Sequence, residues 1–126
     1  MIQLTDDLTL VRGYNMVYLA SPYTKYPRGI YNAAYDISRI AGDLLNDGIN
    51  VFSPVVHSHY IAMLSGMDPL DHDLWMRIDR GFMNNADVLL VCQMTGWEES
   101  RGVEEEIKFF EHHKKPVFGF QPKHYR

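Results

Sequence analysis

Short apolar runs alternate with longer amphipathic stretches along most of the chain. The short runs are rich in β-branched and aromatic residues and end at prolines or polar turns, which is typical of buried strands. They lie at 16–21, 49–54, 87–93 and 115–120. The run at 87–93 is almost continuously apolar. That pattern indicates a strand covered on both faces of its sheet.

The stretches between these runs repeat their apolar residues at helical spacing. They predict helices at 30–48, 68–86 and 103–113. Gly48 supplies a C-terminal stop for the first, and Leu74, Ile78 and Phe82 recur every fourth residue in the second. The pattern at 55–66 predicts a loop with a short helix.

The first fifteen residues, 1–15, form an N-terminal extension of unassigned structure. Within it, the apolar "LTLV" at 8–11 is a candidate for an additional edge strand.

This alternation of strands and helices implies βαβ units in one α/β domain that spans residues 1–126. We expect a Rossmann-like or flavodoxin-like three-layer sandwich with a mostly parallel sheet of about four to five strands. In such sheets the ligand site lies beyond the carboxyl ends of the strands. The loops at 20–30, 53–60 and 93–102 are therefore the expected place of the site.

Charge and composition narrow the function classes. A net charge of −4 over 126 residues, without a basic stripe, argues against binding of a nucleic-acid polymer or a membrane surface. The N-terminus is acidic and lacks a long apolar stretch, and no segment is apolar enough to span a bilayer, so we expect a cytoplasmic protein. Cys92 is the single cysteine, and its apolar surroundings predict a buried structural thiol.

Three consecutive glutamates, 104–106, open the helix expected from Val103. At about 100° per residue, the first two point away from the apolar stripe of that helix, whereas Glu106 falls about 60° from its centre. A first-turn carboxylate after Gly102 is stabilised by free backbone N–H groups and the helix dipole, so it can stay ionised as a nucleophile requires. The alternative is a solvated helix start capped by Ser100, where acids are common.

The motif Ser100-x-Gly102-Val103-x-x-Glu106 follows an apolar strand and an "NNAD" turn. Together with "VYLASPYT", "WMRIDRGFMNNADVLLV" and "KKPVFGF", it resembles the nucleoside 2-deoxyribosyltransferase superfamily, which includes small deoxynucleoside-monophosphate N-glycosidases. The resemblance covers most of residues 16–120 and is closest to a small branch with a "GWxxSxG" variant of the motif.

The resemblance implies roles for individual residues. Glu106 attacks the anomeric carbon of the sugar, and a base or water resolves the covalent intermediate. Asp79 handles the proton on the departing base, and Tyr18 orients the nucleophile. Ser100 stands where the monophosphate glycosidases carry a phosphate-contacting serine and the transferases an aspartate. The superfamily also implies a homo-oligomer in which a neighbour's C-terminal segment, here 120–126, completes the site.

Cleavage of an N-glycosidic bond by two carboxyl groups is chemically reasonable independently of the family resemblance. A carboxylate below the anomeric carbon stabilises an oxocarbenium-like state, and a second acid protonates the leaving group. One departure from the family concerns phosphate. The Gly-rich, Arg-containing phosphate loop of the glycosidases is absent, and the loop after the first strand offers polar residues instead. These are Ser21, Thr24, Lys25 and Arg28. They can bind phosphate at a helix N-terminus or be solvated loop residues, and Arg101 can serve the same role.

Two histidines, His57 and His59, follow the second predicted strand. With Asp71 they suggest a metal-dependent hydrolase, but an H-x-H pair alone is a weak metal signal and no H-E-x-x-H or cysteine cluster accompanies it, so we expect no cofactor. They line the base pocket or bond to the backbone. The rings of Tyr23 and Trp97 either stack on a nucleobase or pack against other side chains of the protein.

The sequence thus predicts an enzyme that cleaves or transfers at the N-glycosidic bond of a nucleoside or nucleotide. The expected substrate-binding residues are Ser21, Tyr23, Arg28, His57, His59, Trp97, Ser100 and Gly102. The alternatives are a nucleotide-binding module of the same fold without turnover and, less favoured, the metal-dependent hydrolase.

Overall fold

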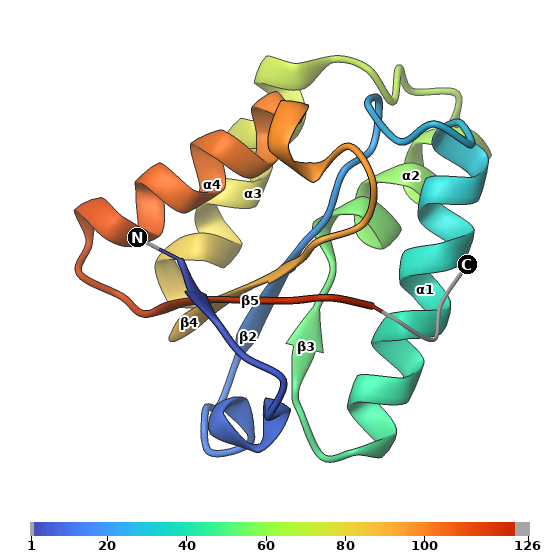
Figure 1. Ribbon diagram of the computed structural model, residues 1–126. Coiled ribbons are helices and arrows are strands. Elements are labelled where there is room, and N and C mark those ends of the chain that lie inside the picture. Colours follow the sequence, from blue (N-terminus) through green and yellow to red (C-terminus); the bar gives the residue numbers. More distant parts are fainter. Residues whose placement is uncertain (1, 123–126) are drawn as a thin grey trace.

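A five-stranded sheet forms the middle layer of the computed structural model, which describes residues 2–122 (Figure 1). The strands are β1 (Gln3–Leu4), β2 (Val17–Ala20), β3 (Val51–Phe52), β4 (Val88–Cys92) and β5 (Val117–Phe120). Their order is β1-β5-β4-β2-β3, and every neighbouring pair is parallel. The α/β fold with a parallel sheet, expected from the alternating pattern, is confirmed.

Helices cover both faces of this sheet. They are α1 (Ile30–Asn46), α2 (Pro54–Ser65), α3 (His72–Asn85) and α4 (Arg101–His112), with short 3₁₀ helices η1 (Leu8–Val11) and η2 (Trp97–Glu99). In Figure 1, α3 and α4 lie together on one side of the strands and α1 on the other, with α2 beside α1. Within residues 2–122, none of the helices has the length and apolarity needed to cross a membrane.

The two central strands divide their side chains between two cores. In β2, Val17 and Leu19 belong to the core under α1, whereas Tyr18 belongs to the core under α3 and α4. The five residues of β4 alternate in the same way, and all are buried. The expectation of a strand covered on both faces is therefore confirmed, and Cys92 is a buried free thiol at its end.

The segment after β3 differs from the prediction, because α2 is one continuous helix and not a loop with a short helix. Ser53 caps it by accepting a hydrogen bond from the Val56 N–H, and Gly66 ends it in the left-handed conformation, with φ of 75°. Its apolar residues face inward and outward alike: Val55 is buried, but Leu64 is 89% exposed. The helix therefore lacks the single apolar stripe by which it could be recognised.

The N-terminal extension is also arranged differently from the prediction. Residues 8–11 form η1 and not a strand, because the Asp7 side chain accepts a hydrogen bond from the Thr9 N–H and starts a helical turn. The additional edge strand is β1, which pairs with β5.

In α3 the buried face is shifted from the one that the four-residue spacing indicated. Leu74, Ile78 and Phe82 are only partly buried. The buried residues of the helix are Trp75, Met76, Asp79 and Met83. The buried face of α3 therefore includes a carboxyl group, that of Asp79, which the spacing of apolar residues did not indicate.

The connections after β2 and β4 place the site. These strands are neighbours, but the chain leaves β2 towards α1 on one face and β4 towards α4 on the other. Such a switch point opens a crevice at the carboxyl ends of the two strands.

Candidate active site

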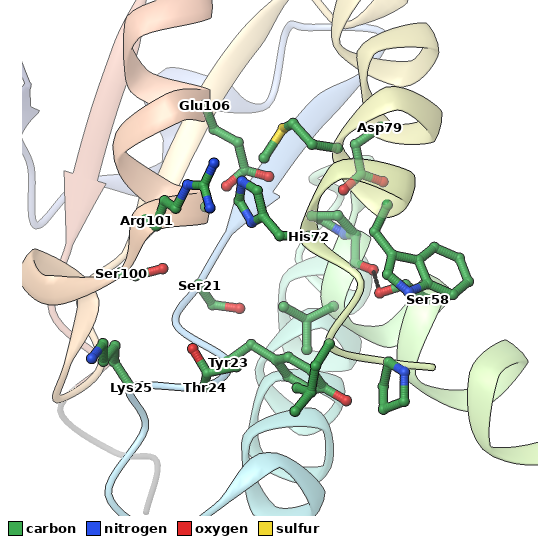
Figure 2. A pocket seen from close by; sticks show the side chains of 17 residues that line it. Ser21, Tyr23, Thr24, Lys25, Ser58, His72, Asp79, Ser100, Arg101 and Glu106 are labelled. Atoms are coloured by element: carbon green, nitrogen blue, oxygen red, sulfur yellow. Dashed lines mark hydrogen bonds between the residues drawn. The ribbon is translucent and has the colours of Figure 1, made fainter. Parts of the chain in front are cut away.

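A cavity of about 370 Å³ lies at this crevice. Its wall is built from the loop after β2, the start of α2, the segment before α3, one face of α3 and the start of α4 (Figure 2). The loops after β2 and β4 touch each other beside it. Gly96 has φ of 97°, and a Cβ at this position would collide with the carbonyl oxygen of Lys25. Only glycine satisfies both conditions at residue 96.

Glu106 is held inward, as the helical spacing indicated. Its side chain lies on the buried face of α4 with Val103 and Phe110, the residue is 5% exposed, and it lines the cavity. The Tyr18 hydroxyl donates a hydrogen bond of 2.6 Å to its Oε2. Tyr18 is fully buried under the cavity, within β2. The nearest group to the Glu106 carboxyl is therefore a hydrogen-bond donor from the neighbouring layer.

The surroundings of Glu106 act against the ionised state that the sequence analysis expected. Burial raises its pKa to about 8, and the Asp79 and Glu105 charges act in the same direction, although the Tyr18 hydrogen bond opposes them. The physical reason is the position of the helix start. Ser100 caps α4 and the helix begins at Arg101, so Glu106 lies beyond the first turn and its free N–H groups.

Asp79 supplies a second buried carboxyl group from α3. It is 6% exposed, lines the same cavity, and one of its oxygens, Oδ1, has no hydrogen-bond partner. Burial raises the pKa of Asp79 to about 7, and the electrostatic interaction with His72 opposes this rise. Two carboxyl groups on adjacent helices therefore titrate near neutrality and influence each other, so their protons belong to the pair.

Polar groups line the opposite side of the cavity, near its opening. Ser21, directly after β2, is buried, and its hydroxyl has no partner. Ser100 lies across from it with its Oγ accepting from the Val103 N–H, and Gly102 lines the wall beside it. Thr24, Lys25 and Arg101 complete this side and are largely exposed.

Tyr23 and His59 lie one behind the other. Tyr23 lines the cavity, and its hydroxyl is 2.6 Å from Nδ1 of His59, which is buried behind it and outside the lining. Burial lowers the pKa of His59, so the neutral ring is favoured. His57, two residues earlier on α2, contacts the Phe52 and Phe82 rings and does not line the cavity.

Two other expected binding residues lie elsewhere. Arg28 forms a 2.8 Å ion pair with the buried carboxylate of Asp36 in α1, and it is not part of the lining. Trp97 lines a second hollow on the outer side of α4. Each side chain is held by a partner outside the cavity. Arg28 is held by Asp36, and Trp97 packs against the apolar core under α3 and α4.

The structure also adds residues that the sequence analysis did not select. The main ones are Ser58, Leu70, His72, Trp75 and Met76. His72 and Asp79 are seven residues apart, which places them on one helix face two turns from each other. That spacing was the available signal for His72.

The geometry around the histidines does not form a metal centre. Among residues 2–122, no group of three or more His, Cys, Asp or Glu side chains is placed to hold a metal ion. The Asp71 carboxylate instead caps α3 by accepting from the Leu74 N–H. In the C-terminal segment that a neighbouring subunit was expected to contribute, residues 123–126 lie outside the described part of the chain.

No curated protein matches the chain with statistical significance. A family model does match, over residues 15–122, a range that includes β2 to β5, all four α-helices and every residue that lines the cavity. The chain therefore belongs to the family described as Domain of unknown function (DUF1937).

Proposed function

We propose that this cavity cleaves the N-glycosidic bond of a nucleoside or nucleotide, with Glu106 as the nucleophile. The observation that carries the proposal is the pair of buried carboxyl groups, Glu106 and Asp79, in one cavity with pKa values raised to about 8 and about 7. A cavity volume of about 370 Å³ falls in the range of small-molecule sites.

The first half of the reaction uses both carboxyl groups. A carboxylate oxygen of Glu106 bonds to the anomeric carbon, the carbon–nitrogen bond breaks, and its electron pair goes to the base nitrogen, which takes the proton of Asp79. The reactive form of the pair thus has its one proton on Asp79. The Tyr18 hydroxyl supports this form because its hydrogen bond stabilises the Glu106 anion.

In the resting protein the higher pKa of Glu106, about 8 against about 7 for Asp79, favours the shared proton on Glu106. The positive charge that develops on the sugar shifts that proton to Asp79. An oxocarbenium-like centre next to Glu106 stabilises the anion more in the transition state than in the resting protein. A buried carboxylate in a site of low polarity provides a larger stabilisation than one in water. Raised pKa values in the resting protein are therefore compatible with a Glu106 nucleophile.

The polar side of the cavity favours a substrate with an anionic substituent on the sugar. The unpartnered hydroxyl of Ser21 lies near the start of α4, whose backbone N–H groups attract anions. Arg101 and Lys25 add positive charge at the opening. We therefore include 5′-monophosphates among the candidate substrates.

The test is incubation of the protein with the four common 2′-deoxynucleosides and their 5′-monophosphates, with release of free base measured by chromatography. We expect release by the wild-type protein, none by Glu106→Gln, and unchanged release by the matched control Glu104→Gln. Glu104 lies two residues before Glu106 in the sequence but pairs with Lys108 on the outer side of α4. If the wild-type protein releases no base, the proposal is wrong, and ligand-dependent thermal stabilisation would then favour a binding module.

A further inference from the structure

His72 is a polar residue of the cavity wall to which the first half of the reaction gives no role. It is the first residue of α3, its side chain is 27% exposed, and it lines the cavity together with Glu106 and Asp79. Figure 2 shows its ring among the lining side chains, next to Arg101 in this view. His72 is thus nearer to solvent than either buried carboxyl group.

A carboxylate from the facing helix fixes this imidazole. Nε2 of His72 is 2.9 Å from Oε2 of Glu105, and the other oxygen of Glu105 accepts a 3.2 Å hydrogen bond from Arg101 Nε. Burial by itself raises the pKa of Glu105, but the hydrogen bonds and charges of His72 and Arg101 together lower it below its ordinary value. Glu105 is therefore an anion, and an anion at this distance requires a proton on Nε2.

That requirement leaves Nδ1 as the free nitrogen of the neutral ring. A carboxylate that orients an imidazole, and stabilises the imidazolium that forms, is a general arrangement for a base that activates a nucleophile. Charged and titratable groups approach the ring from both helices. Glu105 binds it directly, Asp79 lies two turns along α3, and Arg101 and Glu106 of α4 line the same cavity. Lys25 lines the cavity from the loop after β2.

We propose that His72, held by Glu105, is the base that activates water in the second half of the reaction, so that the site is a hydrolase. The inference rests on the proposed function of Glu106. The water oxygen bonds to the anomeric carbon, the bond between that carbon and the Glu106 oxygen breaks with its electrons returning to the carboxylate, and the proton of the water goes to Nδ1 of His72. Glu105 is the positioning residue.

The place of His72 supports this division of roles. The side chains of His72 and Arg101 are 27% and 67% exposed, so solvent water has direct access to this side of the cavity. Asp79 is more deeply buried than His72. In this scheme it stays next to the released base until that base leaves the cavity. A base nearer to solvent allows water to react without waiting for Asp79 to become free.

The kinetic test separates the two halves of the reaction. With a substrate that the wild-type protein cleaves, we expect His72→Gln to keep the first-turnover release of base within about threefold and to slow steady-state release by about 10²-fold. The glycosyl-protein should then accumulate and be visible by intact-protein mass spectrometry. Equal slowing of both phases, or no slowing, would overturn the assignment. If Asp79→Asn reduces the steady-state rate more than His72→Gln does and leaves the first turnover unchanged, the base is Asp79 instead.

The run of glutamates supplies matched variants for the same assay. We expect Glu105→Gln to slow steady-state release by about tenfold and Glu104→Gln to leave it unchanged. Added imidazole should restore part of the steady-state rate in His72→Gly and none in Glu106→Gln. Absence of rescue, with a lowered thermal unfolding temperature, would indicate that the His72–Glu105 pair only joins α3 to α4 and would overturn the assignment.

An NMR measurement tests the geometry without any substrate. Nitrogen-15 shifts of His72 should show the proton of the neutral ring on Nε2, where the Glu105 carboxylate accepts it. A proton on Nδ1 would overturn the inference. Failure of the wild-type protein to release base would instead overturn the proposed function, and the catalytic role of His72 with it.

Discussion

Polar side chains at the two ends of the sheet are treated in opposite ways. At the amino ends, the Asp87 carboxylate accepts hydrogen bonds from the backbone N–H groups of Asn15 and Met16, and Lys115 donates to three backbone carbonyls of residues 83–86. At the carboxyl ends, the Ser21 hydroxyl and one oxygen of Asp79 have no partner. The two polar groups at the amino ends are paired and close the fold there, whereas two buried polar atoms at the carboxyl ends line the cavity without a partner.

The largest expected effect concerns Glu106, at the carboxyl ends. Replacing its carboxyl with an amide in Glu106→Gln should reduce base release by about 10³-fold or more, because the group that stabilises the transition state is lost. The free energy of unfolding should stay the same or rise at pH 8, because a buried ionisable group is removed. Parallel rate and denaturant-unfolding measurements check both. A large loss of stability would place Glu106 with the structural polar groups.

Lys115→Met tests the amino ends in the opposite direction. The ammonium of Lys115 contacts the carbonyl oxygens of Met83, Asn84 and Ala86 at 3.0, 3.0 and 2.7 Å. Its loss leaves partly buried acceptors unpaired and should lower the free energy of unfolding by about 2–3 kcal/mol. Urea unfolding measures this, and Lys114→Met, at the preceding position, is the control. Loss of activity in a folded Lys115→Met protein would contradict the separation of roles.

The dependence of stability on pH should come from the carboxyl ends. Burial raises the pKa of Glu106 to about 8 and that of Asp79 to about 7, from ordinary values of 4.5 and 3.8. The folded protein therefore binds more protons than the unfolded chain between about pH 4 and 8, and its stability falls as the pH rises through that window. Thermal unfolding across this range should show a smaller slope in Glu106→Gln.

The smallest effect is expected for Glu104, which belongs to neither end. Its carboxylate is 3.9 Å from Lys108 one turn along α4, and both side chains are exposed. Glu104→Gln should change the free energy of unfolding by less than about 0.5 kcal/mol and leave base release unchanged. A change above about 1 kcal/mol would indicate that the outer side of α4 contributes more than an exposed ion pair.

The parts of the fold that sequence alone predicted are those whose signals are local. Continuous apolar runs predicted β2 and β4, and the helical spacing of α4 predicted that Glu106 points inward. The continuous helix α2 was missed because its apolar residues do not form one stripe. The rise in the pKa of Glu106 was not anticipated, because α4 begins at Arg101, two residues before the Val103 from which the helix was expected.

The missed part of the site depends on distances that no local pattern encodes. Glu105 points away from the apolar stripe, which suggested solvent, but α3 lies on that side and brings His72 to 2.9 Å. Arg28 lies on the loop where the site was expected. Its side chain pairs with Asp36 on α1, however, so it does not line the cavity. Both outcomes are decided by how the helices pack on the sheet, which a single sequence does not specify.

The contact between Gly96 and the Lys25 carbonyl joins the two loops beside the cavity into one unit. Neither loop can gain a side chain or a residue at this seam unless the other moves away. Members of a protein family that recognise different molecules would therefore vary elsewhere first. The freest place is the connection between α2 and α3, residues 66–71, where Pro69 and Leu70 form part of the wall. Exchange of that short connection would change the shape of the cavity wall and leave Glu106 and Asp79 in place.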